Sequence, residues 1–305
     1  MKSFNSFWQL TKRNMLLYFR DRGAVFFSLL SMFIIIALML LFLGDMNINS
    51  ITDMLTKLPD RDSSADKKNA ELLLLSWTAA GVIPINSAMV ALSTLSSLIR
   101  DKYTGRSGSI QTAPISRFTI TLSYIAAACA ASVVICTVTL AVSELYLCAK
   151  GMGAYTAAEH FKLLGMILVN SFTYSAMMYL CAVFVKSEGA WGGLGTVIGT
   201  LIGFLGGIYL PVGSLSAGLA DFISCTPVIY GTVMFRKVMT AKIAADTFAG
   251  APSEMLTETK KAMGISYSAF GNGISASGCV LIVTGFGVLF TVIAAAAMFI
   301  KRKDR

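Results

Sequence analysis

The chain has 305 residues, of which 55% are hydrophobic and only 13% are charged, and its mean hydropathy is +0.71. A soluble domain carries roughly a quarter charged residues, so this chain has too little polar surface to cover a water-facing globule. The formal net charge is +9, but the basic residues gather in short clusters beside apolar runs. They are interpreted as topology signals and not as a nucleic-acid surface. The composition predicts an all-α integral membrane protein.

The first 23 residues form an amphipathic segment. Apolar and aromatic side chains recur on one stripe at helical spacing, together with one threonine: Phe4, Trp8, Thr11, Met15 and Tyr18. Most basic side chains lie off this stripe, which predicts a helix over 1–23 in the membrane interface, with its cations toward anionic headgroups. The alternative is an ordinary cytoplasmic helix that packs on the bundle. The next apolar run is long enough to span, so it is interpreted as a retained first span and not as a removable signal.

Six apolar runs bounded by charged residues follow one another along the chain. Each is long enough for a helical crossing, which takes roughly 20 residues. The predicted spans lie near 24–44, 74–98, 119–147, 164–185, 190–210 and 275–300. The third run sits in a long interval between Arg117 and Lys150, and we assign its excess to tilt or to a helix that extends past the bilayer.

The orientation follows from the connections, because the cytoplasmic side retains Lys and Arg. These residues collect in 1–23, in 99–118 and in the C-terminal tail. With six spans these three segments share one side, which places both termini in the cytoplasm of a multi-pass protein of the cell membrane. The connection 45–73 holds six Asp or Glu residues and four Lys or Arg residues. It is predicted to be extracellular, as is 211–274.

The fifth predicted span carries glycines at four-residue intervals: Gly195, Gly199, Gly203 and Gly207. Glycines at this spacing form a flat ridge on a helix, where a second helix can approach backbone to backbone. The ridge therefore predicts close helix packing. The partner helix belongs either to this chain or to a second copy, and the sequence leaves both open.

Few polar side chains interrupt the predicted spans. Asn86 lies in the second span, Asn170 in the fourth, and Glu144 toward the outer end of the third. An intramembrane carboxylate is a functional candidate, although the position of Glu144 favours contact with interfacial water. His160 has no constellation of chemical partners around it in the sequence. The scarcity of buried charge disfavours proton- or sodium-coupled transport.

The six cysteines fall mostly in apolar runs and show no CxxC or Cys/His spacing that would hold zinc. They are interpreted as small apolar packing residues, and their spacing does not support a bridge between Cys148 and Cys225. No cluster of His, Asp or Glu supplies an acid, a base or metal ligands, so no catalytic, cofactor-binding or metal site is predicted. The sequence also lacks the GxxxxGK[ST] phosphate cradle of ATPases.

The connection 99–118 is predicted to be a compact, exposed knob, because a polar helix end is followed by glycines, a short polar segment and a proline. Its notable residues are Arg100, Asp101, Gly105, Thr112, Pro114, Ser116 and Arg117. This pattern resembles the permease subunits of type-2 ABC exporters (the ABC-2 type transporter permease family), which place an acidic residue and a glycine after the second span and then a Thr-x-Pro-x-Ser-like stretch. The family more often has glutamate where Asp101 stands. The resemblance implies a coupling helix that docks into an ATPase, with Asp101 pairing with a cation there or capping that helix.

A second resemblance follows the fifth span. A Leu-Pro segment at Pro211 precedes a Pro-x-x-Tyr segment at Pro227 and Tyr230, and the family carries such segments as short helices that dip back into the outer leaflet. The first span lacks the proline that many relatives carry in its outer half, and the region from Met239 to Gly273 is longer than in compact relatives. These departures bear on the substrate more than on membership.

The resemblance covers the whole six-span plan and implies a single transmembrane permease domain over 1–305. It implies two permease chains, identical or different, with two ATPase subunits that bind ATP and Mg and supply all the hydrolysis. Spans that are nearly uncharged and rich in aromatic residues and methionine favour an amphipathic cargo, such as a drug, a peptide or a lipid-like molecule. The alternatives are an ATP-independent secondary transporter and a membrane-embedded enzyme.

Overall fold

The computed structural model describes residues 2–38, 44–56, 58–59, 61–106, 108, 112, 115–209 and 212–300. Its α-helices are α1 (Lys2–Arg20), α2 (Arg22–Leu38), α3 (Gly44–Leu55), α4 (Ser63–Tyr103), α6 (Arg117–Ala149), α7 (Ala157–Phe184), α8 (Glu188–Leu205), α9 (Ala217–Ser224), α10 (Pro227–Met239), α11 (Ala241–Thr247), α12 (Ser253–Ala262) and α13 (Ala276–Ile300). The 3-10 turn η2 (Val212–Ser214) precedes α9, and the strands β1 (Ser268–Ala269) and β2 (Asn272–Gly273) form an antiparallel hairpin. The prediction of an all-helical fold is confirmed for the part of the chain that the structure describes.

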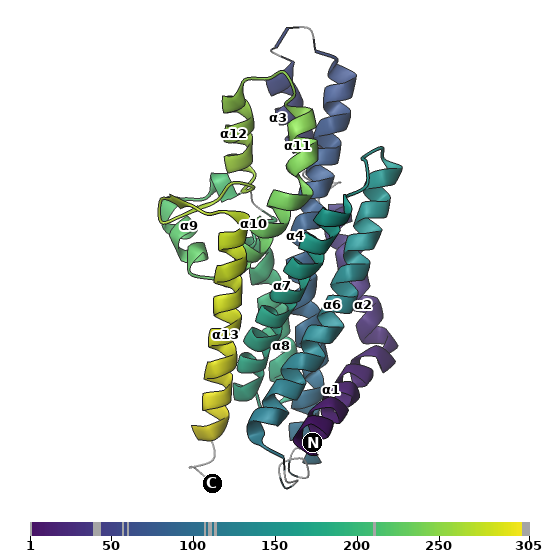
Figure 1. Ribbon diagram of the computed structural model, residues 1–305, viewed down its shortest axis with the longest axis vertical. Coiled ribbons are helices and arrows are strands. Elements are labelled where there is room, and N and C mark those ends of the chain that lie inside the picture. The colour runs from purple at the N-terminus through teal and green to yellow at the C-terminus, as the bar shows by residue number, and fades with distance from the viewer. Residues whose placement is uncertain are drawn as a thin grey trace.

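The centre of the bundle is α4, which packs against α6, α7, α8 and α10 (Figure 1). Its 41 residues correspond to about 60 Å at 1.5 Å per residue, roughly twice the hydrocarbon thickness of a bilayer. The helix begins at an Asp62 cap, whose carboxylate accepts a hydrogen bond of 2.9 Å from the Ser64 amide. It passes through Pro84 without ending, because neighbouring helices can satisfy the backbone groups that a proline leaves free. The predicted second span, 74–98, is therefore part of a longer helix.

Four of the described helices are long and apolar enough to cross a membrane, namely α4, α6, α7 and α13, and the bent pair α9–α10 makes up to five. The chain is thus a multi-pass membrane protein by length and composition. Helices α2 and α8 overlap the predicted spans 24–44 and 190–210, but their described residues do not meet the same criteria of length and apolar composition. Residues 39–43 and 210 lie outside the described residues, and the count of six spans stays a prediction.

One end of the molecule, called here the basal end, collects the start of α1, the end of α4, the start of α6 and the end of α13 (Figure 1). The opposite, distal end carries α3, α11 and α12. This arrangement supports the expectation that the three basic segments share one side, although residues 301–305 of the tail lie outside the described residues. Which end faces the cytoplasm stays a prediction.

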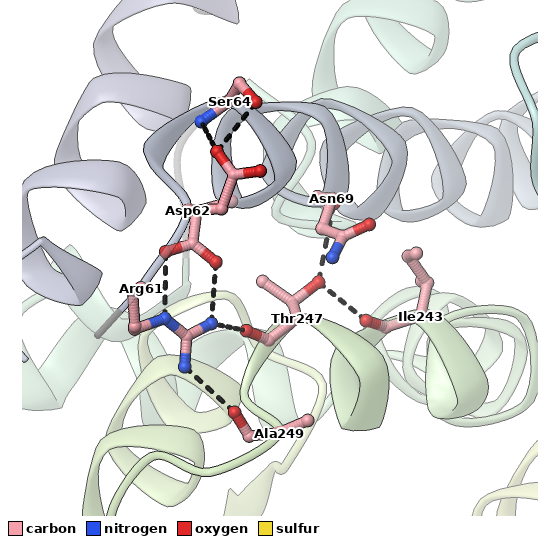
Figure 2. Close-up of polar contacts among 8 residues, drawn as sticks. Arg61, Asp62, Ser64, Asn69, Ile243, Thr247 and Ala249 are labelled. Atoms are coloured by element: carbon pink, nitrogen blue, oxygen red, sulfur yellow. Dashed lines mark hydrogen bonds and ion pairs between the residues drawn. The ribbon is translucent and has the colours of Figure 1, made fainter. Parts of the chain in front are cut away.

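The distal end is held together by Arg61, just before α4. Its guanidinium forms an ion pair of 2.7 Å with Asp66 of α4 and donates to the carbonyl oxygens of Thr247 and Ala249 at 2.8 and 2.9 Å. Figure 2 shows Arg61 reaching from the start of α4 to these carbonyls at the end of α11. The side chain therefore caps the C-terminus of α11 and ties it to α4, where a cation is also favoured by the helix dipole.

The stripe of α1 that the sequence predicts to face the membrane is exposed in the first half of the helix and buried in the second half. Phe4 and Trp8 are exposed, at 72% and 59%, but Thr11 and Tyr18 are buried at 6% and 3%, and α1 packs along α6 (Figure 1). The hydroxyl of Thr11 lies 3.5 Å from the carbonyl oxygen of Ser123, to which it donates. The first half of α1 therefore keeps the aromatic surface expected of an interfacial helix, whereas the second half belongs to the bundle, as the alternative supposed.

Candidate functional site

The last turn of α4 is the point at which the chain enters the predicted coupling connection. Consecutive residues of a helix point about 100° apart, so Arg100, Asp101 and Lys102 reach in three directions. Each contacts a different part of the bundle. We call these three residues the α4 junction.

The first part of the junction is the carboxylate of Asp101. It accepts two hydrogen bonds of 2.8 Å from the guanidinium of Arg13 on α1 and one of 2.7 Å from the hydroxyl of Tyr124 on α6. A bidentate, charge-assisted pair of this kind is among the stronger polar contacts in proteins. The hydrogen bond to Asp101 also raises the pKa of Arg13 above its usual value. Asp101 therefore joins α1, α4 and α6.

The expectation that Asp101 lies in an exposed loop is wrong. Its side chain is 4% exposed, and its oxygens bind Arg13 and Tyr124 of the same chain. Asp101 lies within α4, whose last residue is Tyr103, and not in the connection. The sequence shows the charge of this residue but gives no sign of a partner so far away along the chain.

The second part of the junction is Lys102, whose ammonium lies at the end of α7. Nζ donates to the carbonyl oxygens of Ala182 and Val185 at 2.5 and 3.3 Å. The last carbonyls of a helix have no partner within it, and a lysine at this position both satisfies them and suits the helix dipole. Lys102 thus ties α4 to α7.

The third part of the junction is Arg100, whose Nε lies 3.7 Å from a carboxylate oxygen of Glu188. Both side chains are largely exposed, so this ion pair contributes little to stability. Its place is informative, because Glu188 is the first residue of α8. Three successive side chains therefore link the end of α4 to α1, α6, α7 and α8.

The other residues predicted to couple to an ATPase lie beyond the junction. Gly105 has a φ of +74°, a conformation that glycine adopts at no steric cost, and no neighbouring atom lies within 4 Å of the position of an added Cβ. Thr112 is exposed. Ser116 caps α6 by accepting a hydrogen bond of 3.1 Å from the Thr119 amide, and Arg117 is the first residue of that helix. Pro114 lies outside the described residues.

The glycine ridge packs within this chain for at least part of its length. A Cβ added to Gly195 would lie 3.1 Å from Leu92, and one added to Gly199 would lie 3.3 Å from Met89. Leu92 and Met89 are residues of α4. This part of the ridge therefore faces α4, so its partner helix belongs to this chain and not to a second copy.

Gly203 and Gly207 have other surroundings. A Cβ on Gly203 would collide with the ring of Tyr209, at 2.2 Å. Gly207 lies beyond α8, which ends at Leu205, and it has a φ of +62°. The Ile208 amide donates to the Gly203 carbonyl, and the Gly207 amide donates to the Phe204 carbonyl, which is the Schellman arrangement of a helix C-terminus. The assignment of Gly207 to the packing ridge is wrong, because this residue ends the helix.

The predicted outer segment is a bent pair of helices. Residues Gly218–Ser224 and Pro227–Met239 meet at 88°, with Pro227 at the first position of α10, where a missing amide proton costs nothing. The Tyr230 hydroxyl donates to the Ser224 carbonyl at 2.7 Å and so closes the bend. This shape fits either a broken span or a re-entrant segment. Pro211 lies outside the described residues.

Sequence reasoning missed two polar groups. Arg236 of α10 is completely buried, and the adjacent Arg236-Lys237 pair in an apolar helix was the available signal.

The second group is His160, which the sequence predicts to have no chemical partner. It does have one, because its Nε2 lies 2.8 Å from a Glu144 carboxylate oxygen. Glu144 also accepts a hydrogen bond of 2.9 Å from the Tyr155 amide. The His160–Glu144 pair therefore closes the turn between α6 and α7, which gives the Glu144 carboxylate a role within the fold.

All six cysteines are free.

The fold and the α4 junction define a helical multi-pass membrane protein in which one connection is tied to several helices at once. The chain belongs to the ABC-2 type transporter family, whose model matches residues 5–240. It is therefore the transmembrane permease component of an ABC transporter. A comparison with individual curated proteins found no match.

Proposed function

We propose that this chain is the transmembrane subunit of an ATP-driven exporter in the cell membrane, with both termini in the cytoplasm and a separate ATPase that hydrolyses ATP. The observation that carries the proposal is the α4 junction. One helical turn holds α1, α6, α7 and α8 where the chain enters the predicted coupling connection. A displacement of this connection by an ATPase would move these helices together, as rigid-body mechanisms of switching require.

The ATPase contact is assigned to the connection itself. Its candidate residues are Gly105, Thr112, Pro114, Ser116 and Arg117, together with Arg100, which is exposed in the last turn of α4 just before the connection. Asp101 takes a different role, because its carboxylate is already bound within the chain. We assign it to positioning, since it fixes α1 and α6 relative to the end of α4.

Besides the ATPase, the partners of the permease are a second permease chain and lipid. Helix α8 leaves Val197, Leu201 and Phe204 about half exposed on the side away from α4, and this apolar side supports contact with a second chain. An apolar groove of about 540 Å³ between α1, α6 and α7 supports contact with lipid. Phe7 and Phe172 are among the residues that line it. An amphipathic cargo that is drug-like, peptidic or lipid-like suits the apolar bundle.

The test is reconstitution. The permease should co-purify with an ABC ATPase encoded beside it, and cargo should stimulate phosphate release by the complex in nanodiscs. Transport of cargo in liposomes that contain the permease without any ATPase would contradict the proposal.

A secondary transporter is the second candidate, and one observation favours it. Buried side chains of α7 keep polar atoms that find no hydrogen-bond partner among the residues the structure describes, namely both amide atoms of Asn170 and the hydroxyls of Tyr174 and Ser175. Unpaired polar groups in a membrane bundle are costly and suit the binding of an ion or a polar cargo. Ion-gradient-driven uptake or efflux in liposomes, lost in Asn170→Leu, would support this candidate.

A further inference from the structure

Arg236 of α10 is a buried cation that has no anionic partner within the described part of the chain. Its side chain is 0% exposed, and among the described residues no carboxylate forms an ion pair with it. Nη2 donates to the Gly207 carbonyl at 2.8 Å, Nη1 lies 3.5 Å from the Met263 carbonyl oxygen, and Nε has no partner. The guanidinium carbon lies 4.1 Å from the centre of the Trp77 ring.

These contacts bring three distant segments to one guanidinium. Trp77 belongs to α4, Gly207 ends α8, and Met263 follows α12. Trp77 also donates its indole N–H to the Met263 carbonyl at 2.6 Å. Arg236 and Trp77 therefore hold the turn after α12 jointly.

Two glycines, one in α4 and one in the turn after α12, leave room for the guanidinium because they carry no side chain. A Cβ added to Gly81 would lie 3.6 Å from Nη2, and one added to Gly264 would lie 3.3 Å from Nη1. A methyl group at either position would press on the cation or on the apolar side chains beside it. The guanidinium thus fills a fitted space between α4 and the turn after α12.

Burial of this cation is unfavourable unless its surroundings compensate for the lost water. Two carbonyl oxygens and an aromatic face offset part of the cost, but no anion neutralises the charge, and one donor is unpaired. Separation of the three segments would return the guanidinium to water. The contacts of the guanidinium hold the three segments together, and the uncompensated charge keeps this hold weak enough for the segments to separate under a small force.

We propose that Arg236 is a latch that holds α4, the end of α8 and the turn after α12 together, and that opening of this contact accompanies transport. It joins α10 of the bent pair to the end of α8 and to α4, the helix that carries the junction at the basal end. Opening would release the Gly207 and Met263 carbonyls together. The link to transport rests on the proposed function, whereas the latch itself is a property of the permease alone.

The experiment uses a reporter thiol at Val212, which is 7% exposed and packs against Gly264. Val212→Cys is introduced together with Cys225→Ser, because Cys225 is the exposed native thiol. The permease is placed in nanodiscs, and the rate of reaction with a membrane-impermeant maleimide is measured. Arg236→Gln should raise this rate about tenfold or more, because the cation–π contact and the paired carbonyl contacts are lost together.

The matched control is Lys237→Gln. It removes the same charge at the adjacent position of α10, where Nζ donates to the Ile274 carbonyl, and it should leave the reporter rate unchanged. Trp77→Phe keeps an aromatic ring but loses the bond to Met263, so it should give a smaller increase. An unchanged rate in Arg236→Gln, or an equal increase in Lys237→Gln, overturns the latch. If Arg236→Gln does not yield monodisperse protein, Trp77→Phe decides in the same way.

A second arm tests the link to transport. With the ATPase bound, a non-hydrolysable ATP analogue should raise the reporter rate in the otherwise wild-type permease and have little further effect in Arg236→Gln. A raised rate in Arg236→Gln, together with no response to the nucleotide in the otherwise wild-type permease, would support the latch and contradict the ATP-driven function. The two ideas therefore fail separately.

Discussion

Arg13 and Asp101 lie 88 residues apart in the chain and meet through two hydrogen bonds of 2.8 Å. The pair fixes α1 to the end of α4, and Tyr124 adds α6 through the same carboxylate. The position at which the chain enters its predicted coupling connection is therefore set by contacts inside the permease.

Asp101→Ala should destabilise the permease. It leaves a partly buried guanidinium and a tyrosine hydroxyl without their acceptor, which we expect to cost about 2 kcal/mol after allowance for the exposure of Arg13. Thermal unfolding of the purified permease in detergent measures the effect. The double variant Arg13→Ala/Asp101→Ala should lose less stability than the sum of the two single variants. Additive losses would mean that the two side chains do not interact.

Arg106→Glu, which reverses a charge in the connection beside the candidate contact residue Gly105, should weaken ATPase association without unfolding the permease. Arg106 is exposed, and an exposed substitution usually changes stability by less than about 0.5 kcal/mol. A reversed charge at a docking surface acts on association much more strongly. Pull-down of the ATPase and cargo-stimulated phosphate release are the measurements. Arg22→Glu, at an exposed position outside the connection, is the control, and equal behaviour of the two variants would remove Arg106 from the contact.

Gly199→Leu should destabilise the bundle, whereas Gly193→Leu should not. A side chain at Gly199 meets Met89 of α4, but nothing lies within 4 Å of a Cβ at Gly193. Overpacking of this kind typically costs about 1–3 kcal/mol. The unfolding midpoints of the two variants, measured side by side, test the packing. A stable Gly199→Leu variant would show that α8 can move away from α4 at no cost.

Thiol labelling should assign the two ends of the molecule to the two sides of the membrane. Ser63 and Ser253 are exposed at the starts of α4 and α12, and Thr104 is exposed just after α4. In intact cells an impermeant maleimide should react with Ser63→Cys and Ser253→Cys but reach Thr104→Cys only after permeabilisation. External labelling of Thr104→Cys would reverse the orientation.

The sequence predicted the long helices well, because α4, α6, α7 and α13 are apolar runs between charges. It did not predict where individual polar side chains point. The charge of Asp101 and its place near a helix end predict an exposed side chain, and only the folded chain brings Arg13 to it. His160 and Glu144 are likewise a pair across two helices.

The glycine pattern shows a different limit of sequence reasoning. Gly203 and Gly207 have the same spacing as Gly195 and Gly199, yet the helix stops at Leu205. A spacing rule assumes that the helix continues, and the left-handed conformation of Gly207 that ends it leaves no mark in the spacing. Arg236 was missed for a related reason, because the adjacent Arg236-Lys237 pair in an apolar helix does not reveal whether either charged group reaches water.

Helix α4 is a single rod of about 60 Å with its proline close to the middle. A tilt of about 5° around that midpoint would displace each tip by roughly 2.5 Å, since each arm is about 30 Å long. One tip carries the α4 junction, which includes Asp101. The other tip lies beside Arg61, whose side chain ties α4 to α11. Because the helix is continuous, a displacement of one tip would move the other tip in the opposite direction.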